Sequence, residues 1–120
     1  MSYESPDGEV TLERELSEPL ILGRLPGDEG ITLLPEDPTI SSKAIRLETN
    51  DGILIVKNTS TYSELDIQHD KGIRFLFPGE ELRTASSVVI VLRGQTYTHT
   101  INVTLEGSQQ TSISDGNTIS

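Results

Sequence analysis

The sequence is divided into short apolar stretches, and this division is the feature that most restricts the folds open to it. Turn-forming residues separate the stretches, for example Asn50-Asp51-Gly52 and Asp70-Lys71-Gly72. Short apolar segments at such spacing are typical of strands in a sandwich or barrel. We therefore predict an all-β fold, a two-sheet antiparallel β-sandwich with strands near residues 19–22, 31–34, 44–47, 53–56, 65–67, 73–77, 88–92 and 97–105.

The last stretch gives the clearest alternation between apolar and polar residues. His99, Ile101 and Val103 fall on one face of a strand, and threonines and Asn102 fall on the other. Alternation with a period of two predicts one buried and one solvated face. His99 is thus predicted to be a buried, hydrogen-bonded core histidine, and His69 to be an exposed turn residue. The predicted core includes Ile21, Leu33, Ile55, Ile90, Ile101 and Val103.

The 120 residues fit a single domain, because two separate cores of half this size would be too small to be stable. We predict the sandwich to span residues 18–106. Residues 1–17 are acidic and are expected to form a solvating arm or a first strand that contains Val10 and Leu12. Residues 107–120 are polar and without apolar periodicity, so we expect a flexible tail.

Composition narrows the chemistry that the chain can perform. It has no cysteine and two histidines, and no nucleophile elbow or metal-binding pattern surrounds them. We therefore expect no enzyme, cofactor or metal site. The net charge of -10 with scattered basic residues argues against nucleic acid. No apolar run approaches the roughly 18 residues of a membrane span, so we expect a cytoplasmic protein without membrane contact.

Three groups of residues occur in an order that suggests a family. The first group, Gly23 and Arg24, directly follows the stretch 19–22. The second group, residues 41–43, follows a proline-containing loop. The third group, 58–61, follows the stretch 53–56. In this order and spacing, the chain resembles the forkhead-associated domain family over about residues 18–105. The resemblance includes the weaker matches Phe77-Pro78-Gly79-Glu80-Glu81-Leu82, Val88 to Leu92 and Gly94.

The resemblance implies a β-sandwich of forkhead-associated type whose loops at one end bind a phosphothreonine peptide. In the family, an arginine and a serine contact the phosphate, and they correspond here to Arg24 and Ser41. An always-charged planar guanidinium beside hydroxyl donors suits a doubly charged phosphate. The candidate phosphopeptide-binding residues are Arg24, Ser41, Lys43, Ser60 and Thr61, with Ser42 and Tyr62 as further candidates.

Several positions differ from the family pattern. Ala44 stands where the family has a histidine that braces the loops, and Tyr62 replaces an asparagine. Ser63 and Glu64 replace glycine and threonine. Two functions therefore stay open. One is a signalling adaptor that binds a phosphothreonine-containing or Ser/Thr kinase-linked partner, and the other is a degenerate scaffold subunit that binds partners independently of phosphorylation.

The polar tail adds one candidate modification site. Thr111 lies in the sequence Gln-Gln-Thr-Ser, which a kinase could modify if the tail is exposed. A phosphate there would create a ligand for a phosphothreonine reader, within one molecule or between two.

Overall fold

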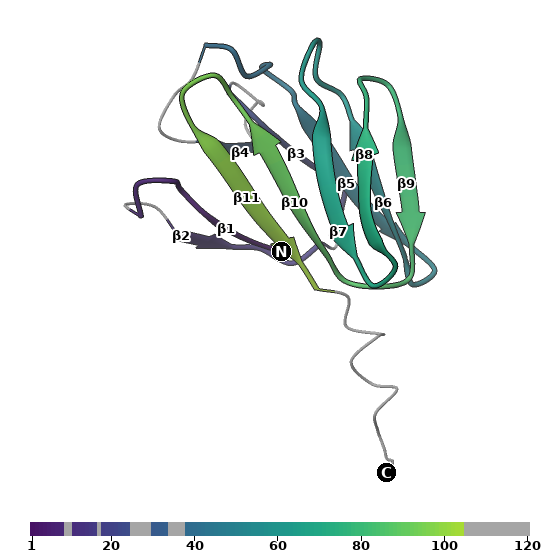
Figure 1. Cartoon of the computed structure of the whole chain (residues 1–120). Helices are drawn as coiled ribbons and strands as arrows, with labels where there is room; N and C mark the ends of the chain where they lie inside the picture. Colours follow the sequence, from purple (N-terminus) through teal and green to yellow (C-terminus); the bar gives the residue numbers. More distant parts are fainter. Residues whose placement is uncertain (9–10, 17, 25–29, 34–37, 105–120) are drawn as a thin grey trace.

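The computed structural model describes residues 1–8, 11–16, 18–24, 30–33 and 38–104, which form 11 β-strands (Figure 1). The strands are β1 Ser2–Glu4, β2 Thr11–Glu13, β3 Leu20–Gly23, β4 Ile31–Thr32, β5 Ile45–Asn50, β6 Ile53–Asn58, β7 Leu65–His69, β8 Gly72–Leu76, β9 Glu81–Thr84, β10 Val88–Arg93 and β11 Thr98–Val103. The prediction of an all-β chain is confirmed for the described residues.

The strands form two open sheets that pack face to face. One sheet has the order β2-β1-β11-β10-β7-β8, and the other has the order β4-β3-β5-β6-β9. All pairings are antiparallel except that of β3 with β4, which is parallel with Leu22 beside Ile31. The chain crosses between the sheets after β2, β6, β8 and β9. The predicted two-sheet sandwich is thus confirmed, with one parallel exception to the antiparallel pattern.

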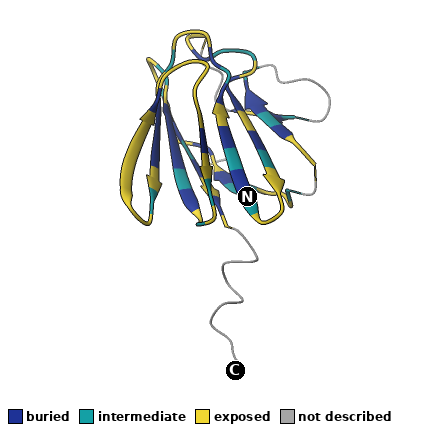
Figure 2. Ribbon diagram, turned by 90° about the vertical axis from the view of Figure 1, so that its right-hand side faces the viewer, coloured by how far each residue is buried: buried dark blue, intermediate teal, exposed yellow. Residues whose placement is uncertain are grey.

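The core lies between the sheets, and buried residues alternate with less buried ones most clearly along β5, β6 and β11 (Figure 2). The predicted core positions His99, Ile101 and Val103 are buried on β11, as are Leu33 and Ile90. Two other predictions were wrong. Ile21 and Ile55 are only partly buried, because the core side of β3 and β6 is taken by their neighbours Leu20, Leu22, Leu54 and Val56.

The first strand belongs to the core, which corrects the expectation of a solvating arm. Tyr3 on β1 is 1% exposed and lies opposite Ile101 on β11. Its hydroxyl is 2.8 Å from Nδ1 of His99, which is itself completely buried. The alternative of a strand near Leu12 is confirmed for Thr11–Glu13, but this strand is the second and pairs with β1, which comes before it. Predicted strand residue Val10 lies outside the described residues.

We expect Tyr3→Phe to destabilise the domain by about 1–2 kcal/mol, because it removes the hydroxyl partner of buried His99 Nδ1 and keeps the ring. At this chain length the loss corresponds to a Tm decrease of roughly 5–10 °C. Thermal unfolding followed by circular dichroism measures it. Tyr97→Phe is the matched control, since Tyr97 is only partly buried. Equal melting temperatures for Tyr3→Phe and wild type would contradict the role of this bond.

The two ends of the sandwich differ in the loops and turns that connect their strands. At one end, β3 finishes, β5 begins, and the chain passes from β6 to β7, from β8 to β9 and from β10 to β11 (Figure 1). We call Arg24 and residues 38–44, 59–64 and 94–97 the loop end. At the opposite end, β5 and β6 are joined by a tight turn in which Asp51 and Gly52 have φ of 54° and 79°. Positive φ at both central residues defines a type I′ hairpin turn.

Candidate functional site

The loop end is built on an unusually close approach of two backbones at Gly23. A Cβ atom on this residue would lie 2.1 Å from the carbonyl oxygen of Ser42, so only glycine fits. The contact is flanked by two backbone hydrogen bonds, from Arg24 N to Ser41 O at 3.0 Å and from Ala44 N to Leu22 O at 2.8 Å. The end of β3 therefore lies directly on the segment that contains Ser41.

The side chain of Arg24 is oriented by the same segment. Its Nε donates a hydrogen bond to the carbonyl oxygen of Ile40 at 3.1 Å. Ile40 is 2% exposed and so anchors this contact in the core. Since guanidinium carries five N–H donors in a fixed plane, one bond at Nε sets the orientation of the whole group. Arg24 is thus held at the loop end next to Ser41.

Ser41 connects the segment 38–44 to the loop between β6 and β7. Its Oγ accepts a hydrogen bond from the backbone N–H of Thr61 at 2.8 Å. A hydroxyl that accepts in this way keeps its own proton to donate. The structure therefore brings Arg24, Ser41 and Thr61, which are far apart in the sequence, to one place.

The loop 59–64 is fixed from below by Asn58, which is completely buried at the end of β6. Its Nδ2 donates to the carbonyl oxygens of Ser63 and Leu76, both at 2.8 Å. Its Oδ1 accepts from the backbone N–H of Ser60 at 3.0 Å and from the Ser60 hydroxyl. One amide thus ties the loop to β8.

The phosphopeptide-binding residues predicted from the sequence do not all lie at the surface. Ser60 is 5% exposed, and its hydroxyl lies 2.8 Å from the Ser63 carbonyl oxygen, so it stabilises the loop from within. Ser42 is half-buried and supplies the carbonyl oxygen beneath Gly23. Lys43 and Thr61 are exposed, and Tyr62 is 90% exposed. Surface chemistry at the loop end therefore comes from Arg24, Ser41, Lys43, Thr61 and Tyr62.

A residue that the sequence prediction did not assign to the site also holds these loops together. Thr59 donates from its backbone N–H to Ala44 O at 3.0 Å and from its hydroxyl to Lys43 O at 2.9 Å. The β10–β11 loop joins them through a bond from Gln95 N to Thr39 Oγ1 at 2.9 Å. The only sequence signal for these anchors is a run of polar residues directly after an apolar strand.

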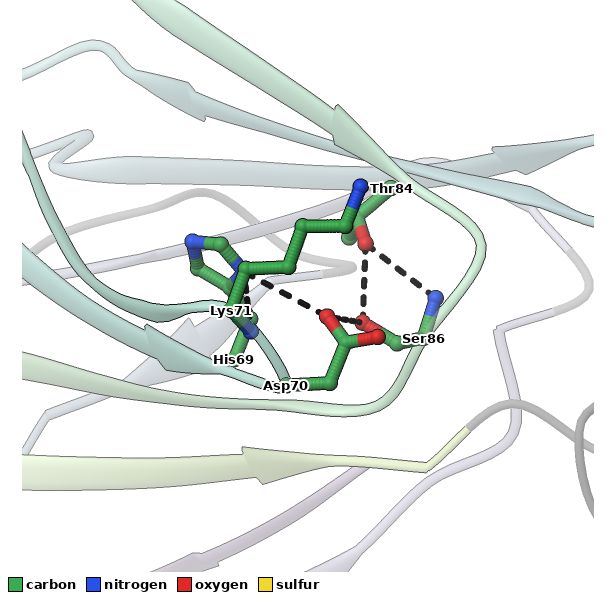
Figure 3. A network of polar contacts seen from close by, with 5 residues as sticks. All are labelled: His69, Asp70, Lys71, Thr84 and Ser86. Atoms are coloured by element: carbon green, nitrogen blue, oxygen red, sulfur yellow. Dashed lines mark hydrogen bonds and ion pairs between the residues drawn. The ribbon is translucent and has the colours of Figure 1, made fainter.

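A second polar cluster lies at the opposite end of the sandwich, where Asp70 joins the β7–β8 turn to the segment after β9 (Figure 3). The Ser86 hydroxyl donates to Asp70 Oδ1 at 3.2 Å and lies 2.9 Å from the hydroxyl of Thr84. His69 accepts from Lys71 N at 3.3 Å and is partly buried, so the prediction of an exposed histidine was wrong. The cluster stabilises a crossing between sheets.

The described part of the chain has neither a cluster of metal ligands nor a membrane-spanning helix. Within 1–8, 11–16, 18–24, 30–33 and 38–104 no group of three or more potential ligands could hold a metal ion. The same ranges contain no helix long and apolar enough to cross a membrane. Thr111 and the rest of the predicted tail lie outside the described residues.

Comparison with known proteins gives no assignment. No family model matches the chain, and neither curated proteins nor solved structures show a significant match. The inference of function therefore depends on the geometry of the loop end.

Proposed function

We propose that the domain is a protein-interaction module of forkhead-associated type that binds a phosphothreonine-containing peptide or protein at its loop end. The observation that carries the proposal is the junction of Arg24, Ser41 and Thr61. Two hydrogen bonds make this junction, from Arg24 N to Ser41 O at 3.0 Å and from Thr61 N to Ser41 Oγ at 2.8 Å. Recognition is the whole function, and no covalent step takes place.

The chemistry of these side chains suits a phosphate group. Arg24 contributes a permanent charge in a planar donor arrangement, and Lys43 adds a second, exposed positive charge. A phosphate group has three acceptor oxygens, whereas a carboxylate has two. The hydroxyls of Ser41 and Thr61 are neutral donors that can bind the additional oxygen. Because anchoring bonds already fix the loops, little ordering entropy is lost when a ligand binds.

The bonds made by Thr59 support the proposal at the position where the chain departs from the family. Ala44 replaces the bracing histidine and is completely buried. Its carbonyl oxygen accepts the Thr59 N–H, and the neighbouring carbonyl of Lys43 accepts the Thr59 hydroxyl. These two bonds join the same pair of loops that a histidine would brace.

The second candidate function is a scaffold subunit that docks partners without phosphate. It is favoured by Tyr62, which is 90% exposed where the family has an asparagine, and by exposed Glu64 two residues later. An aromatic ring in open solvent suits a hydrophobic contact. A carboxylate there would repel phosphate.

The test is binding to an array of matched phosphothreonine and unmodified peptides, followed by titration of the best ligand. Wild type should prefer the phosphorylated form, and Arg24→Ala should weaken its binding by roughly 10- to 150-fold. Hydrogen bonds between charged groups contribute about 1.5–3 kcal/mol, and each 1.4 kcal/mol is tenfold. Ser41→Ala should act in the same direction more weakly.

Arg83→Ala is the matched control, because Arg83 lies on β9, outside the loop end. Its Nε forms an ion pair with Glu81 at 2.8 Å. The variant should bind like wild type. Glutamate in place of phosphothreonine should fail, since it has one charge and no tetrahedral oxygens. If wild type shows no preference for phosphate, yet retains a partner that Arg24→Ala also retains, the scaffold function replaces the reader.

A further inference from the structure

Most of the large apolar side chains exposed in the described part of the chain lie on or next to one strand. Ile73, Phe75 and Phe77 are 60%, 52% and 57% exposed, and the fourth exposed apolar residue is Tyr62. Ile73 and Phe75 alternate with Arg74 and Leu76 on β8, so their side chains share one face, and Phe77 directly follows the strand. That row of apolar side chains is unlike the polar surface expected of an edge strand.

β8 is the last strand of the six-stranded sheet and pairs only with β7. A two-residue turn joins them, and His69 lies opposite Gly72 at its base. In such a hairpin the closing pair is hydrogen-bonded and the next pair is not. The N–H and C=O groups of Ile73 and Phe75 therefore point away from β7, toward the edge of the sheet.

We propose that β8 is a self-association edge, at which a second copy of this chain adds its own β8 in antiparallel orientation. With Phe75 on the two-fold axis, each Phe75 lies opposite the other, and Ile73 lies opposite Phe77 of the second copy. Each exposed apolar side chain then has an apolar cross-strand neighbour. Such a contact is isologous and closes as a dimer.

The charge pattern favours a second copy at this edge over other parts of the surface. The chain has a net charge of -10, so two copies repel each other across most surfaces. From residue 71 to 79 there is no carboxylate in the sequence, and Arg74 lies on the opposite face from the apolar row. On the face of the apolar row, the carboxylate opposite Phe75 is Asp66, which is paired with Arg93, so repulsion between two acidic copies is reduced along β8.

The size of the contact is typical of a weak complex. β8 spans five residues, and the Phe77 N–H is already bound to Glu80 Oε1 at 2.8 Å, so backbone pairing centres on Phe75. So short a strand pair buries less than about 1,000 Å², which is the range of weak complexes. The dimer is therefore expected to be weak and to form only at high protein concentration.

Sedimentation velocity tests this with the full chain, from about 10 to 500 µM and at low and high salt. Wild type should shift from monomer to dimer, and salt should strengthen the dimer because it screens the repulsion between acidic copies. Phe75→Lys should stay monomeric over the same range. Its Tm should stay close to that of wild type, because the side chain is already half-exposed.

Tyr62→Lys is the matched control, since it introduces the same charge at another exposed aromatic ring, in the loop 59–64 outside β8. It should dimerise like wild type. A wild-type chain that stays monomeric at every concentration would overturn the proposal, as would a Phe75→Lys variant that dimerises normally. A dimer that Tyr62→Lys abolishes and Phe75→Lys retains would place the contact at the loop end and would equally refute β8.

Discussion

Replacing Gly23 with alanine is expected to destabilise the domain by about 3 kcal/mol, at the upper end of the usual cost of forcing an extra carbon into a packed region. The new Cβ would lie 2.1 Å from the Ser42 carbonyl oxygen and 2.9 Å from the Ala44 nitrogen. Both are backbone atoms, which cannot rotate away as a side chain can. Thermal unfolding should show a Tm decrease of about 10 °C or more.

Gly52→Ala is the control for this substitution. A Cβ at Gly52 would meet nothing within 4 Å, so its cost comes only from the positive φ of 79°. That conformation costs an alanine about 1 kcal/mol. If the two alanine variants lose the same stability, the approach of β3 to Ser42 is not a tight contact.

Asn58→Asp is expected to cost about 3–5 kcal/mol at neutral pH, a second large effect. The substitution keeps the shape of a completely buried side chain but removes the two N–H donors that bind Ser63 O and Leu76 O. A carboxylate oxygen would then face two carbonyl oxygens without a positive partner. Uncompensated buried charges of this kind cost several kcal/mol.

The pH dependence of this loss has a defined sign. Burial raises the pKa of the introduced carboxyl in the folded state above its unfolded value of about 3.9. The folded variant then binds the proton more tightly than the unfolded chain, so its stability falls as pH rises. The difference from wild type in urea unfolding should therefore be smaller at about pH 5 than at about pH 8.

Asn102→Asp serves as control, because Asn102 is exposed on β11 and its charged form stays hydrated. It should unfold almost like wild type at both pH values. A loss that is equal at both pH values for Asn58→Asp would mean that the new carboxylate is not buried.

The fold class followed from the sequence because the turn signals stand out. Asn50-Asp51-Gly52 and Asp70-Lys71-Gly72 mark turns at which the structure does reverse the chain. It was harder to predict which face of a strand is buried wherever both faces are apolar. The apolar runs containing Ile21 and Ile55 read equally well in either register, and packing against the opposite sheet selects their neighbours.

Two strands went unpredicted because they have almost no apolar pattern of their own. β1 has the sequence Ser-Tyr-Glu, and only the long-range contact of Tyr3 with His99 makes it a core strand. β9 has one buried apolar residue, Leu82, between charged and polar neighbours. Both depend on partners that are distant in the sequence, and periodicity does not report distant partners.

The candidate site was predictable in part. The spacing of Arg24, Ser41 and Thr61 indicated three loops that would meet, and the structure brings these residues together. The burial of each residue was not predictable. Ser60 and Thr61 are adjacent, yet Ser60 is buried and Thr61 is exposed. Burial there depends on Asn58, whose amide draws Ser60 inward.

The tight turn at Asp51 and Gly52 makes a simple chemical handle possible. The chain contains no cysteine, so one introduced thiol would be unique. Asn50 is exposed at the base of this turn and does not have the positive φ of the next two residues. β5 separates it from the loop end by six residues, which is about 20 Å at the rise of a strand. Asn50→Cys would therefore accept a maleimide dye at one defined position. Coupled to a sensor chip through the same thiol, every molecule would have its loop end facing the solution.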